Sequence, residues 1–364
     1  MKENNENSWN DELKGRLKKR SQLEEYIELE AAQAAWFTQS EEKGDDILPF
    51  MTSRYYLETA LAAGPDGRAA ILRQIIPSAE EFVVKDYELS DPLGEAKYSP
   101  APRLVHCYPD RALILVTDEC AMFCRHCFRR SFTGGMKGAL TDAELDPILE
   151  YFRCKPEISE VLLTGGDPLT LSDDRLKSII SRIKDVRPEM IIRLCTRMPV
   201  VLPSRITAQL VAMLGSYDGI WLVTHFNHPS EITIEAAGGI RAMRKAGVPV
   251  LNQTVLLRGV NDNLETLSSL FRRLLSKGVK PYYLFQGDLA AGTSHLRVPL
   301  EEALRLTAEL KDLISGMAMP RFAVDLPGGG GKITLPSQHH QLEREGDFFT
   351  VKGLDNEQYR YPAN

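Results

Sequence analysis

Three cysteines lie within eight residues of one another: Cys120, Cys124 and Cys127. They directly follow a short apolar run at residues 112–116. Three thiolates on one loop can bind three corners of an iron–sulfur cube, because soft sulfur ligands suit iron, and the fourth iron then has no protein ligand. The spacing therefore predicts an iron–sulfur centre with one open iron at which chemistry can occur.

Two other interpretations of these cysteines remain open. A structural zinc site would need a fourth Cys or His at regular spacing, and three buried thiols could also have no chemical role. The remaining cysteines, Cys107, Cys154 and Cys195, are scattered and do not form a disulfide framework. Clustered thiols in a reducing compartment favour metal binding or catalysis.

The composition excludes several classes of protein. The 364 residues carry a formal net charge of −6 with both signs interspersed, so no electrostatic surface for nucleic acid is expected. No apolar run approaches the ~20 residues that cross a bilayer. We therefore expect a cytoplasmic protein without a membrane anchor or a nucleic-acid partner.

The chain predicts a helical N-terminal region followed by a barrel. Residues 8–39, 52–63 and 66–76 have helical periodicity, and a connector rich in Pro and Gly follows. Short apolar runs then alternate with amphipathic segments, which is typical of βα units around a parallel sheet. The six runs are 112–116, 160–163, 190–194, 220–223, 248–255 and 280–285, and the helical segments are 141–153, 172–186, 204–215, 231–246 and 263–277.

This alternation predicts an α/β fold, a partial (β/α)6 TIM-like barrel. We divide the chain into a helical region and linker (1–107), the barrel (108–317) and a C-terminal segment with a polar tail (318–364). Active sites of such barrels lie at the C-terminal ends of the strands. Polar residues follow each run, so one shared cavity is expected; they are the cysteine loop, 164–167, 196–197, 224–228, 252–253 and 286–288.

A second unusual stretch is the run of four glycines at 328–331, which ends in Lys332. A nucleotide-binding P-loop would need Gly in place of Leu326 and Ser or Thr in place of Ile333, so that interpretation fails. A flexible linker is the plain alternative. A single lysine on a slim backbone arm after the apolar strand 322–324 suits a Schiff base with pyridoxal phosphate (PLP).

The cysteine spacing resembles the signature of the radical S-adenosylmethionine (SAM) enzymes, and the whole stretch from about 108 to 332 resembles the lysine 2,3-aminomutase family. That resemblance implies a [4Fe–4S] cluster, SAM and PLP as cofactors. It implies Cys120, Cys124 and Cys127 as cluster ligands, Gly165, Gly166, Asp167, Gln253 and His126 as SAM contacts, Lys332 as the Schiff-base lysine, and Tyr108 and Arg111 as contacts of the PLP phosphate. The chain departs from the family at Cys107, where an arginine usually adds a phosphate contact.

The resemblance also implies the substrate and the reaction. Arg129 matches the position that binds the substrate carboxylate, and a guanidinium suits that task through paired hydrogen bonds. Asp288 and Asp325 match the two aspartates that hold the ε-ammonium of L-lysine, although single Asp residues at strand ends also cap loops. We expect an isomerase that forms β-lysine through a 5′-deoxyadenosyl radical.

Several alternatives accompany this prediction. The substrate could be glutamate or arginine, or the protein could be a non-catalytic iron–sulfur or zinc protein, in which Lys332 and the charged set would have no purpose. A one-electron donor such as flavodoxin or ferredoxin and a homo-oligomer are expected partners. Two branches of the family stay open: one makes free β-lysine for metabolism, and the other makes (R)-β-lysine for attachment to elongation factor P. The sequence of residues 127–130 and the short tail after Lys332 favour the elongation factor P branch. His225 and His228 lack the third ligand of a zinc site.

Overall fold

The computed structural model describes residues 6–43, 47–135, 138–335, 343–346, 348–352 and 358–362. Its centre is a nine-stranded sheet in which the strands follow one another in sequence order, from β1 to β9. The parallel strands are β2 (Arg111–Thr117), β3 (Glu160–Gly165), β4 (Ile191–Cys195), β5 (Ile220–Thr224), β6 (Val250–Val255), β7 (Lys280–Phe285) and β8 (Arg321–Leu326). The antiparallel edge strands are β1 (Leu104–Tyr108) and β9 (Gly331–Thr334).

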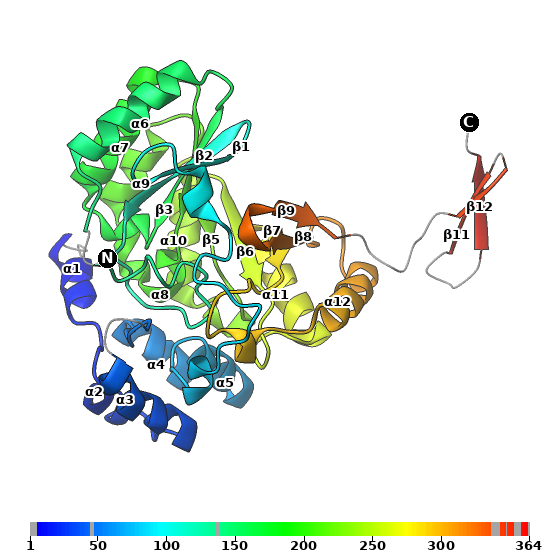
Figure 1. Cartoon of the computed structure of the whole chain (residues 1–364), viewed down its shortest axis with the longest axis horizontal. Helices are drawn as coiled ribbons and strands as arrows, with labels where there is room; N and C mark the ends of the chain where they lie inside the picture. Colours follow the sequence, from blue (N-terminus) through cyan, green and yellow to red (C-terminus); the bar gives the residue numbers. More distant parts are fainter. Residues whose placement is uncertain are drawn as a thin grey trace.

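The sheet is curved, and helices cover its outer face (Figure 1). Its inner face lines a cavity. On β2 and β6 every second residue is fully buried, while Leu113, Gln253 and Val255 line the cavity. This alternation follows from the period of two along a strand. The covering helices are α6 (Asp142–Cys154), α7 (Asp173–Val186), α8 (Met198–Val201), α9 (Ala208–Gly215), α10 (Ile234–Lys245), α11 (Leu264–Ser276) and α12 (Leu300–Leu313).

Side-chain caps start five of these helices, as the Ser, Thr and Asn residues before them predict. The hydroxyl of Thr141 accepts a hydrogen bond from the Glu144 N–H, and the Glu144 carboxylate in turn accepts from the Thr141 N–H. This capping box satisfies two helix-end groups that have no partner within the helix. The other four capping residues are Ser172, Thr207, Thr233 and Asn263.

The partial barrel is confirmed, and its sheet holds one parallel strand more than the six predicted. The additional strand is β8, which α12 connects to β7. The edge strands β1 and β9 do not pair with each other, so the sheet is open there. The Tyr108 hydroxyl of β1 accepts a 2.7 Å hydrogen bond from the Lys332 backbone N–H of β9, and this contact bridges the opening.

The N-terminal helices pack on the barrel as part of the same hydrophobic core (Figure 1). Tyr56, Leu57 and Ile71 are fully buried in a cluster that also contains barrel residues such as Ile114 and Leu163. These helices are α1 (Glu6–Lys14), α2 (Arg20–Glu24), α3 (Ala31–Lys43), α4 (Arg54–Ala62) and α5 (Pro65–Arg73). Two short 3-10 helices follow, η2 (Ala79–Phe82) and η3 (Glu95–Tyr98). The division at residues 107 and 317 stays a prediction.

Beyond β9 the described residues form a separate three-stranded antiparallel sheet: β10 (Glu343–Glu345), β11 (Phe348–Lys352) and β12 (Gln358–Pro362). The rest of the predicted polar tail lies outside the described residues. Of the helices that the structure describes, none has both the length and the apolar character needed to cross a bilayer.

Candidate active site

The three clustered cysteines lie on the loop after β2, and all three line the interior cavity. Each is a free thiol. Burial raises the pKa of Cys120 and Cys127, and the neighbouring cysteine sulfurs raise both values further, so the three sulfurs lie within electrostatic range of one another. Burial disfavours the thiolate form of each cysteine unless a cation balances its negative charge. A group of buried thiols therefore suits metal binding, which fits an iron–sulfur cluster.

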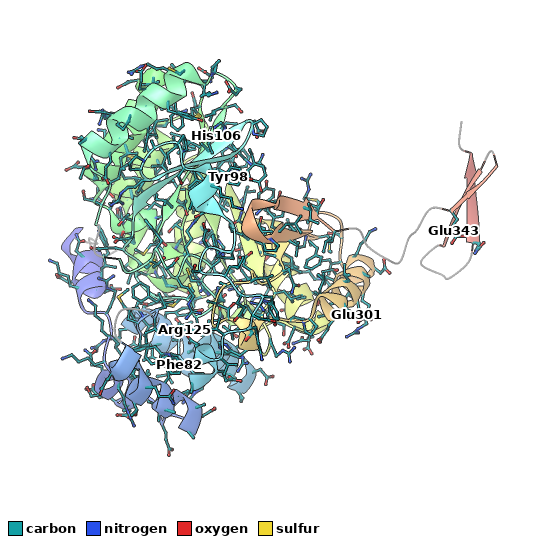
Figure 2. All side chains as sticks on the ribbon, viewed as in Figure 1. Phe82, Tyr98, His106, Arg125, Glu301 and Glu343 are labelled. Carbon is teal, nitrogen blue, oxygen red and sulfur yellow. The ribbon has the colours of Figure 1, made fainter. Side chains whose placement is uncertain are left out.

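The N-terminal region holds the cysteine loop in place. The Phe123 N–H donates to the Met51 carbonyl at 2.9 Å. The Arg125 guanidinium donates to the carbonyls of Leu48, at 3.0 Å, and Pro49, at 2.8 Å. Figure 2 places Arg125 at the junction of the N-terminal helices and the barrel. The connector between α3 and α4, to which the sequence gave no role, therefore holds the backbone from which the cysteines project.

The charge of Arg125 is balanced by Glu81 of η2. The Glu81 carboxylate accepts 2.8 and 2.5 Å hydrogen bonds from Arg125 and a 2.6 Å bond from Arg130. The side chains of Arg125 and Glu81 are 0% and 3% exposed. Burial alone would raise the pKa of Glu81, but the two arginines lower it below its ordinary value. The carboxylate is therefore ionised and joins the N-terminal region to the cysteine loop.

Glu81→Gln is expected to lower the free energy of unfolding by about 3–5 kcal/mol, because it leaves buried arginine charge without its partner. Denaturant titration of the variant measures this loss. The matched control is Glu150→Gln, which removes a carboxylate from the exposed pair with Arg153 and should cost less than about 1 kcal/mol. Equal losses in the two variants would contradict the role of Glu81.

Gly165 and Gly166 let β3 end against the backbone of the cysteine loop. A Cβ atom on Gly165, where φ is +119°, would lie 2.3 Å from the Thr117 carbonyl oxygen. A Cβ on Gly166 would lie 2.2 Å from the Glu119 carbonyl oxygen. The structure therefore supplies a reason for the glycines other than the predicted open approach to SAM: side chains here would push the cysteine loop away.

Asp167 lines the cavity, and its carboxylate already accepts three hydrogen bonds. Oδ1 accepts from the Thr196 hydroxyl at 2.6 Å and from the Leu169 N–H at 3.0 Å, and Oδ2 accepts from the Arg197 N–H at 2.7 Å. Burial raises the pKa of Asp167 above its ordinary value. The carboxylate thus ties the end of β3 to the end of β4, and its predicted contact with SAM stays a prediction.

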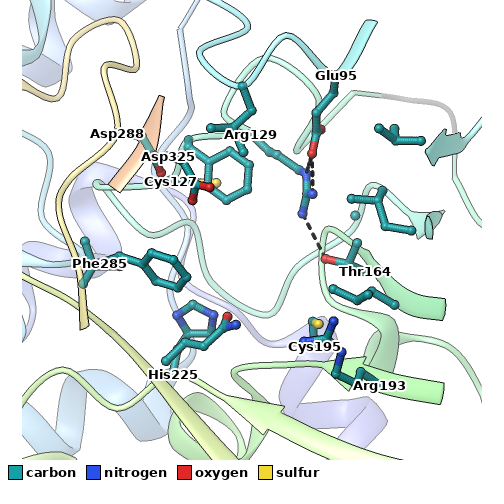
Figure 3. Close-up of a pocket in the computed structure, with 18 of the residues that line it drawn as sticks. Glu95, Cys127, Arg129, Thr164, Arg193, Cys195, His225, Phe285, Asp288 and Asp325 are labelled. Carbon is teal, nitrogen blue, oxygen red and sulfur yellow. Dashed lines mark hydrogen bonds and ion pairs between the residues drawn. The ribbon is translucent and has the colours of Figure 1, made fainter. Parts of the chain in front are cut away.

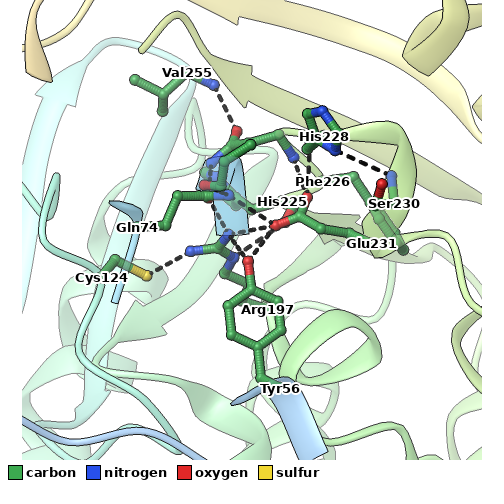
Figure 4. A network of polar contacts seen from close by, with 12 residues as sticks. Tyr56, Gln74, Cys124, Arg197, His225, Phe226, His228, Ser230, Glu231 and Val255 are labelled. Atoms are coloured by element: carbon green, nitrogen blue, oxygen red, sulfur yellow. Dashed lines mark hydrogen bonds and ion pairs between the residues drawn. The ribbon is translucent and has the colours of Figure 1, made fainter. Parts of the chain in front are cut away.

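Arg197, after β4, reaches a predicted cluster ligand. Its Nη1 donates to Cys124 Sγ at 2.9 Å, and its Nη2 donates to Tyr56 at 3.1 Å, Gln74 at 2.5 Å and Glu231 at 2.9 Å (Figure 4). Burial opposes the charge, but the Cys124 sulfur, Tyr56 and Glu231 raise the pKa of Arg197 above its ordinary value. The sequence indicated Arg197 only as a polar residue at a strand end, and nothing local linked it to Tyr56 and Gln74.

His126 and Gln253, both predicted SAM contacts, line the cavity. Burial, and then Arg197, lower the pKa of His126 well below its ordinary value, so its ring is neutral. His126 Nδ1 is buried without a hydrogen-bond partner among the described residues, which fits a site that a ligand completes. Gln253 hydrogen-bonds His225, whose pKa burial lowers to about 4.

His228 does not face the same site as His225. Its Nδ1 accepts a 3.2 Å hydrogen bond from the Ser230 N–H and caps the 3-10 helix η6 (Pro229–Glu231). In the part of the chain that the structure describes, no three His, Cys, Asp or Glu side chains converge on a single metal ion. The thiolates of an iron–sulfur cube bind separate irons, so they do not need to converge in that way.

Lys332 projects into the cavity from β9. Its ammonium lies 3.0 Å from Asp325 Oδ2 and 4.0 Å from the centre of the Phe285 ring. The Arg111 guanidinium lies 3.9 Å from the centre of the Tyr108 ring, next to the Lys332 backbone. A primary amine in the same cavity as an arginine and a tyrosine fits a carbonyl cofactor that carries a phosphate, as PLP does.

Arg129 and the two predicted ammonium-binding aspartates line the same cavity (Figure 3). Arg129 enters from the cysteine loop, Asp325 lies on β8, and Asp288 follows β7. Arg129 Nη1 donates to the Thr164 hydroxyl at 3.0 Å, and its Nε and Nη2 donate to Glu95. Glu95 is a residue that sequence reasoning missed, because it lies in an irregular connector.

One cavity of about 630 Å³ therefore brings together every residue to which the family resemblance gave a role. These residues are Cys120, Cys124, Cys127, His126, Gly165, Gly166, Asp167, Gln253, Arg129, Asp288, Asp325, Tyr108, Arg111 and Lys332. Cys107, which stands where an arginine was expected, lines it too. The roles of the individual residues stay predictions.

Known proteins are similar to this chain over most of its length. The family model of the Radical SAM superfamily matches residues 114–270. The L-lysine 2,3-aminomutase of Fusobacterium nucleatum is 41% identical over 333 residues, which are 92% of this chain and 77% of that protein. The L-lysine 2,3-aminomutase of Clostridium subterminale is 40% identical over 90% of this chain and 78% of its own.

A glutamate 2,3-aminomutase, that of Clostridioides difficile, is 41% identical over 264 residues, which are 72% of this chain and 62% of that protein. Sequence identity therefore identifies the chain as a 2,3-aminomutase but does not decide between lysine and glutamate as the substrate. The chain belongs to the lysine 2,3-aminomutase family of radical SAM enzymes, isomerases that use a [4Fe–4S] cluster, SAM and PLP.

Proposed function

We propose that this aminomutase acts on L-lysine and moves its α-amino group to C3 to give β-lysine. The observation that carries the proposal is the pair of carboxylates, Asp288 and Asp325, beside Lys332. Burial and the adjacent Asp325 raise the pKa of Asp288 to about 7, so the two carboxylates lie close together. Among the residues lining this end, one ammonium, that of Lys332, lies against Asp325 at 3.0 Å. A substrate ammonium would balance the second carboxylate.

The same charges discriminate against other amino acids. A glutamate side chain would bring a third carboxylate to this end of the cavity, and like charges at close range in a buried site repel strongly. Arg129 would bind the α-carboxylate of the substrate. It enters the cavity from the cysteine loop, whereas Asp288 and Asp325 come from the end of the sheet near Lys332. Salt links at the two ends of lysine would fix C3 between the two cofactor sites, and such positioning supplies much of the catalysis in a bimolecular reaction.

The protein's own residues bind, orient and exclude water. Cys120, Cys124 and Cys127 hold the cluster in this proposal, and Lys332 holds PLP. When bound, the cluster with SAM supplies a carbon radical that removes a hydrogen atom, and PLP supplies the π-system that assists migration of the nitrogen. The centres of the Phe285 and Tyr283 rings lie 4.0 and 5.4 Å from the Lys332 ammonium, so these aromatic side chains line the cavity beside the PLP lysine.

A product assay tests the choice of substrate. Anaerobic protein with SAM, PLP and a reductant is incubated with L-lysine, L-glutamate or L-arginine, and the β-amino acids are separated on a chiral column. We expect β-lysine from L-lysine and no β-isomer from the other two. Formation of β-glutamate in preference to β-lysine would overturn the assignment to lysine, and the lysine enantiomer formed identifies the stereochemistry.

The pKa of Asp288 predicts how lysine affinity depends on pH. Below pH 7 the free protein carries a proton on Asp288, and an incoming ammonium must displace it. Binding therefore releases a proton below pH 7, so the Kd for lysine should rise about tenfold for each pH unit below 7 and level off above it. Calorimetric titration of PLP-free protein with L-lysine between pH 5.5 and 8.5 measures the profile, because Lys332 then keeps the ammonium beside which this pKa applies.

Asp288→Asn is the matched variant for this profile, because it keeps the side-chain shape and removes the titrating group. Lysine should bind it more weakly, and the step near pH 7 should disappear. An unchanged step in Asp288→Asn would show that another group titrates there.

The partners of the reaction follow from its chemistry. Reduction of the cluster needs one electron, which supports a flavodoxin or ferredoxin as donor. We place the protein in the cytoplasm as a homo-oligomer, and its three clustered thiols suit a reducing compartment. The likeness of residues 127–130 to the elongation factor P branch supports elongation factor P as the destination of the product.

A further inference from the structure

The predicted carboxylate-binding arginine already holds a carboxylate of the protein itself. Arg129 Nε donates to Glu95 Oε2 at 3.0 Å and to Oε1 at 3.2 Å, and Arg129 Nη2 donates to Oε1 at 2.6 Å (Figure 3). The two side chains are 13% and 19% exposed. This is the paired geometry with which a guanidinium binds the carboxylate of an amino acid. Glu95 thus has the same chemistry as the predicted ligand of Arg129.

Glu95 is one of several groups that position Arg129. Thr164 accepts from Nη1 at 3.0 Å, and the Phe128 ring lies 4.6 Å from the guanidinium carbon. These contacts hold the guanidinium in the cavity from another direction. A second carboxylate brought next to Glu95 on the same cation would meet like-charge repulsion at close range. The two carboxylates therefore compete for Arg129.

We propose that Glu95 is an internal competitor for the substrate α-carboxylate: it occupies Arg129 until the substrate displaces it, and so sets the affinity for ligands that carry this group. The inference rests on the proposed function, since it takes Arg129 as the carboxylate site. Glu95 acts here as a specificity-determining residue, because a ligand without an α-carboxylate gains nothing from displacing it.

The segment that carries Glu95 also contacts the loop that leads to Lys332. Lys97 Nζ donates to the Gly328 carbonyl at 2.8 Å, and the Tyr98 hydroxyl donates to the Gly329 carbonyl at 2.9 Å. A Cβ on Gly94, where φ is +63°, would lie 2.8 Å from the Gly328 carbonyl carbon. Displacement of Glu95 from Arg129 would therefore disturb η3 against η8 (Pro327–Gly329), next to the lysine that holds PLP.

Glu95→Gln in PLP-loaded protein tests the competition. The variant is titrated with L-lysine and with cadaverine, which is lysine without its carboxylate, and PLP absorbance reports binding. Because a neutral amide competes poorly with a carboxylate for a guanidinium, the Kd for L-lysine should fall about tenfold. The Kd for cadaverine should stay within about twofold, because cadaverine leaves Arg129 alone.

The matched control is Glu144→Gln, which makes the same change in a partly buried pair with Arg103 outside the cavity. It should leave both Kd values unchanged. An unchanged or higher Kd for L-lysine in Glu95→Gln would overturn the inference. Wild-type protein that takes up PLP but binds neither ligand would overturn the proposed function instead.

A second measurement does not depend on the folding of a variant. Amide hydrogen exchange of PLP-loaded wild-type protein is followed with and without each ligand. L-lysine should raise the exchange rate across residues 91–98 several-fold, whereas cadaverine should not. Equal exchange in this segment with the two ligands would overturn the displacement of Glu95.

Discussion

Lys332→Ala is expected to lose the visible absorbance of lysine-bound PLP and to lose turnover. Lys332 is the lysine that projects into the cavity at the end of the glycine arm, with its ammonium 3.0 Å from Asp325. Well-oriented tethering is equivalent to effective molarities of ~10⁵ M or more, so we expect activity to fall at least about 10³-fold. Absorption spectra of protein incubated with PLP, together with the rate of β-lysine formation, measure the loss.

The control for this variant is Lys97→Ala. Lys97 contacts the same glycine loop, at the Gly328 carbonyl, but does not line the cavity. The Lys97→Ala variant should bind PLP covalently, as the wild-type protein does. Covalent PLP that persists in Lys332→Ala and disappears in Lys97→Ala would place the PLP lysine elsewhere. Iron content should be the same in both variants, because the cluster ligands are on a different loop.

Cys124→Ser is expected to lose most of the bound iron and the cleavage of SAM. A serine hydroxyl is a hard ligand that suits iron in a cluster poorly, and Cys124 also accepts the hydrogen bond from Arg197. Removal of a side chain that only hydrogen-bonds a metal ligand commonly lowers metal affinity or activity by about 10–100-fold. Removal of a ligand itself should therefore lower the rate of SAM cleavage by more than that. Iron analysis and quantification of 5′-deoxyadenosine under reducing conditions measure both effects.

Cys154→Ser is the matched control, because Cys154 is exposed at the end of α6 and does not line the cavity. It should keep full iron content. Cys124→Ser should still bind PLP at Lys332, since the two sites lie on different elements. A Cys124→Ser protein with unchanged iron and SAM cleavage would contradict the assignment of the cluster to this loop.

Much of the barrel could be predicted from the sequence because its elements are strongly patterned. The run at residues 280–285 coincides with β7, and the run at 160–163 lies within β3. The run at 248–255 began two residues before β6, which starts at Val250 after Pro249, a residue that has no N–H for the sheet. The predicted start of this strand differs from the observed one because backbone hydrogen bonding, and not hydrophobicity, determines where a strand begins.

The seventh parallel strand was harder to count. The sequence predicts an apolar strand at 322–324 before the lysine arm but does not count it among the six strands of the barrel, because the glycine run directly after it hides the turn into β9. In the structure β8 pairs with β7, and Asp325 of β8 lies opposite Lys332 of β9. This antiparallel pairing explains why Asp325 and the Lys332 ammonium are in contact.

The contributions of the N-terminal region could not be predicted, because they depend on contacts between distant parts of the chain. Gln74 meets Asn227, 153 residues away, and Tyr56 meets Glu231, 175 residues away. A helical pattern indicates which face of a helix is buried but not what it packs against. Glu95 was missed for a related reason, since a single Glu among turn residues has no spacing that marks a function.

The most direct test of the account is a crystal structure of the anaerobically purified protein with SAM, PLP and L-lysine. We predict a [4Fe–4S] cluster on Cys120, Cys124 and Cys127 and PLP in the same cavity, with C3 of lysine within about 4 Å of the 5′ carbon of SAM, the range of carbon–carbon contact. A cluster and a PLP-bound Lys332 on opposite sides of the sheet would contradict the account.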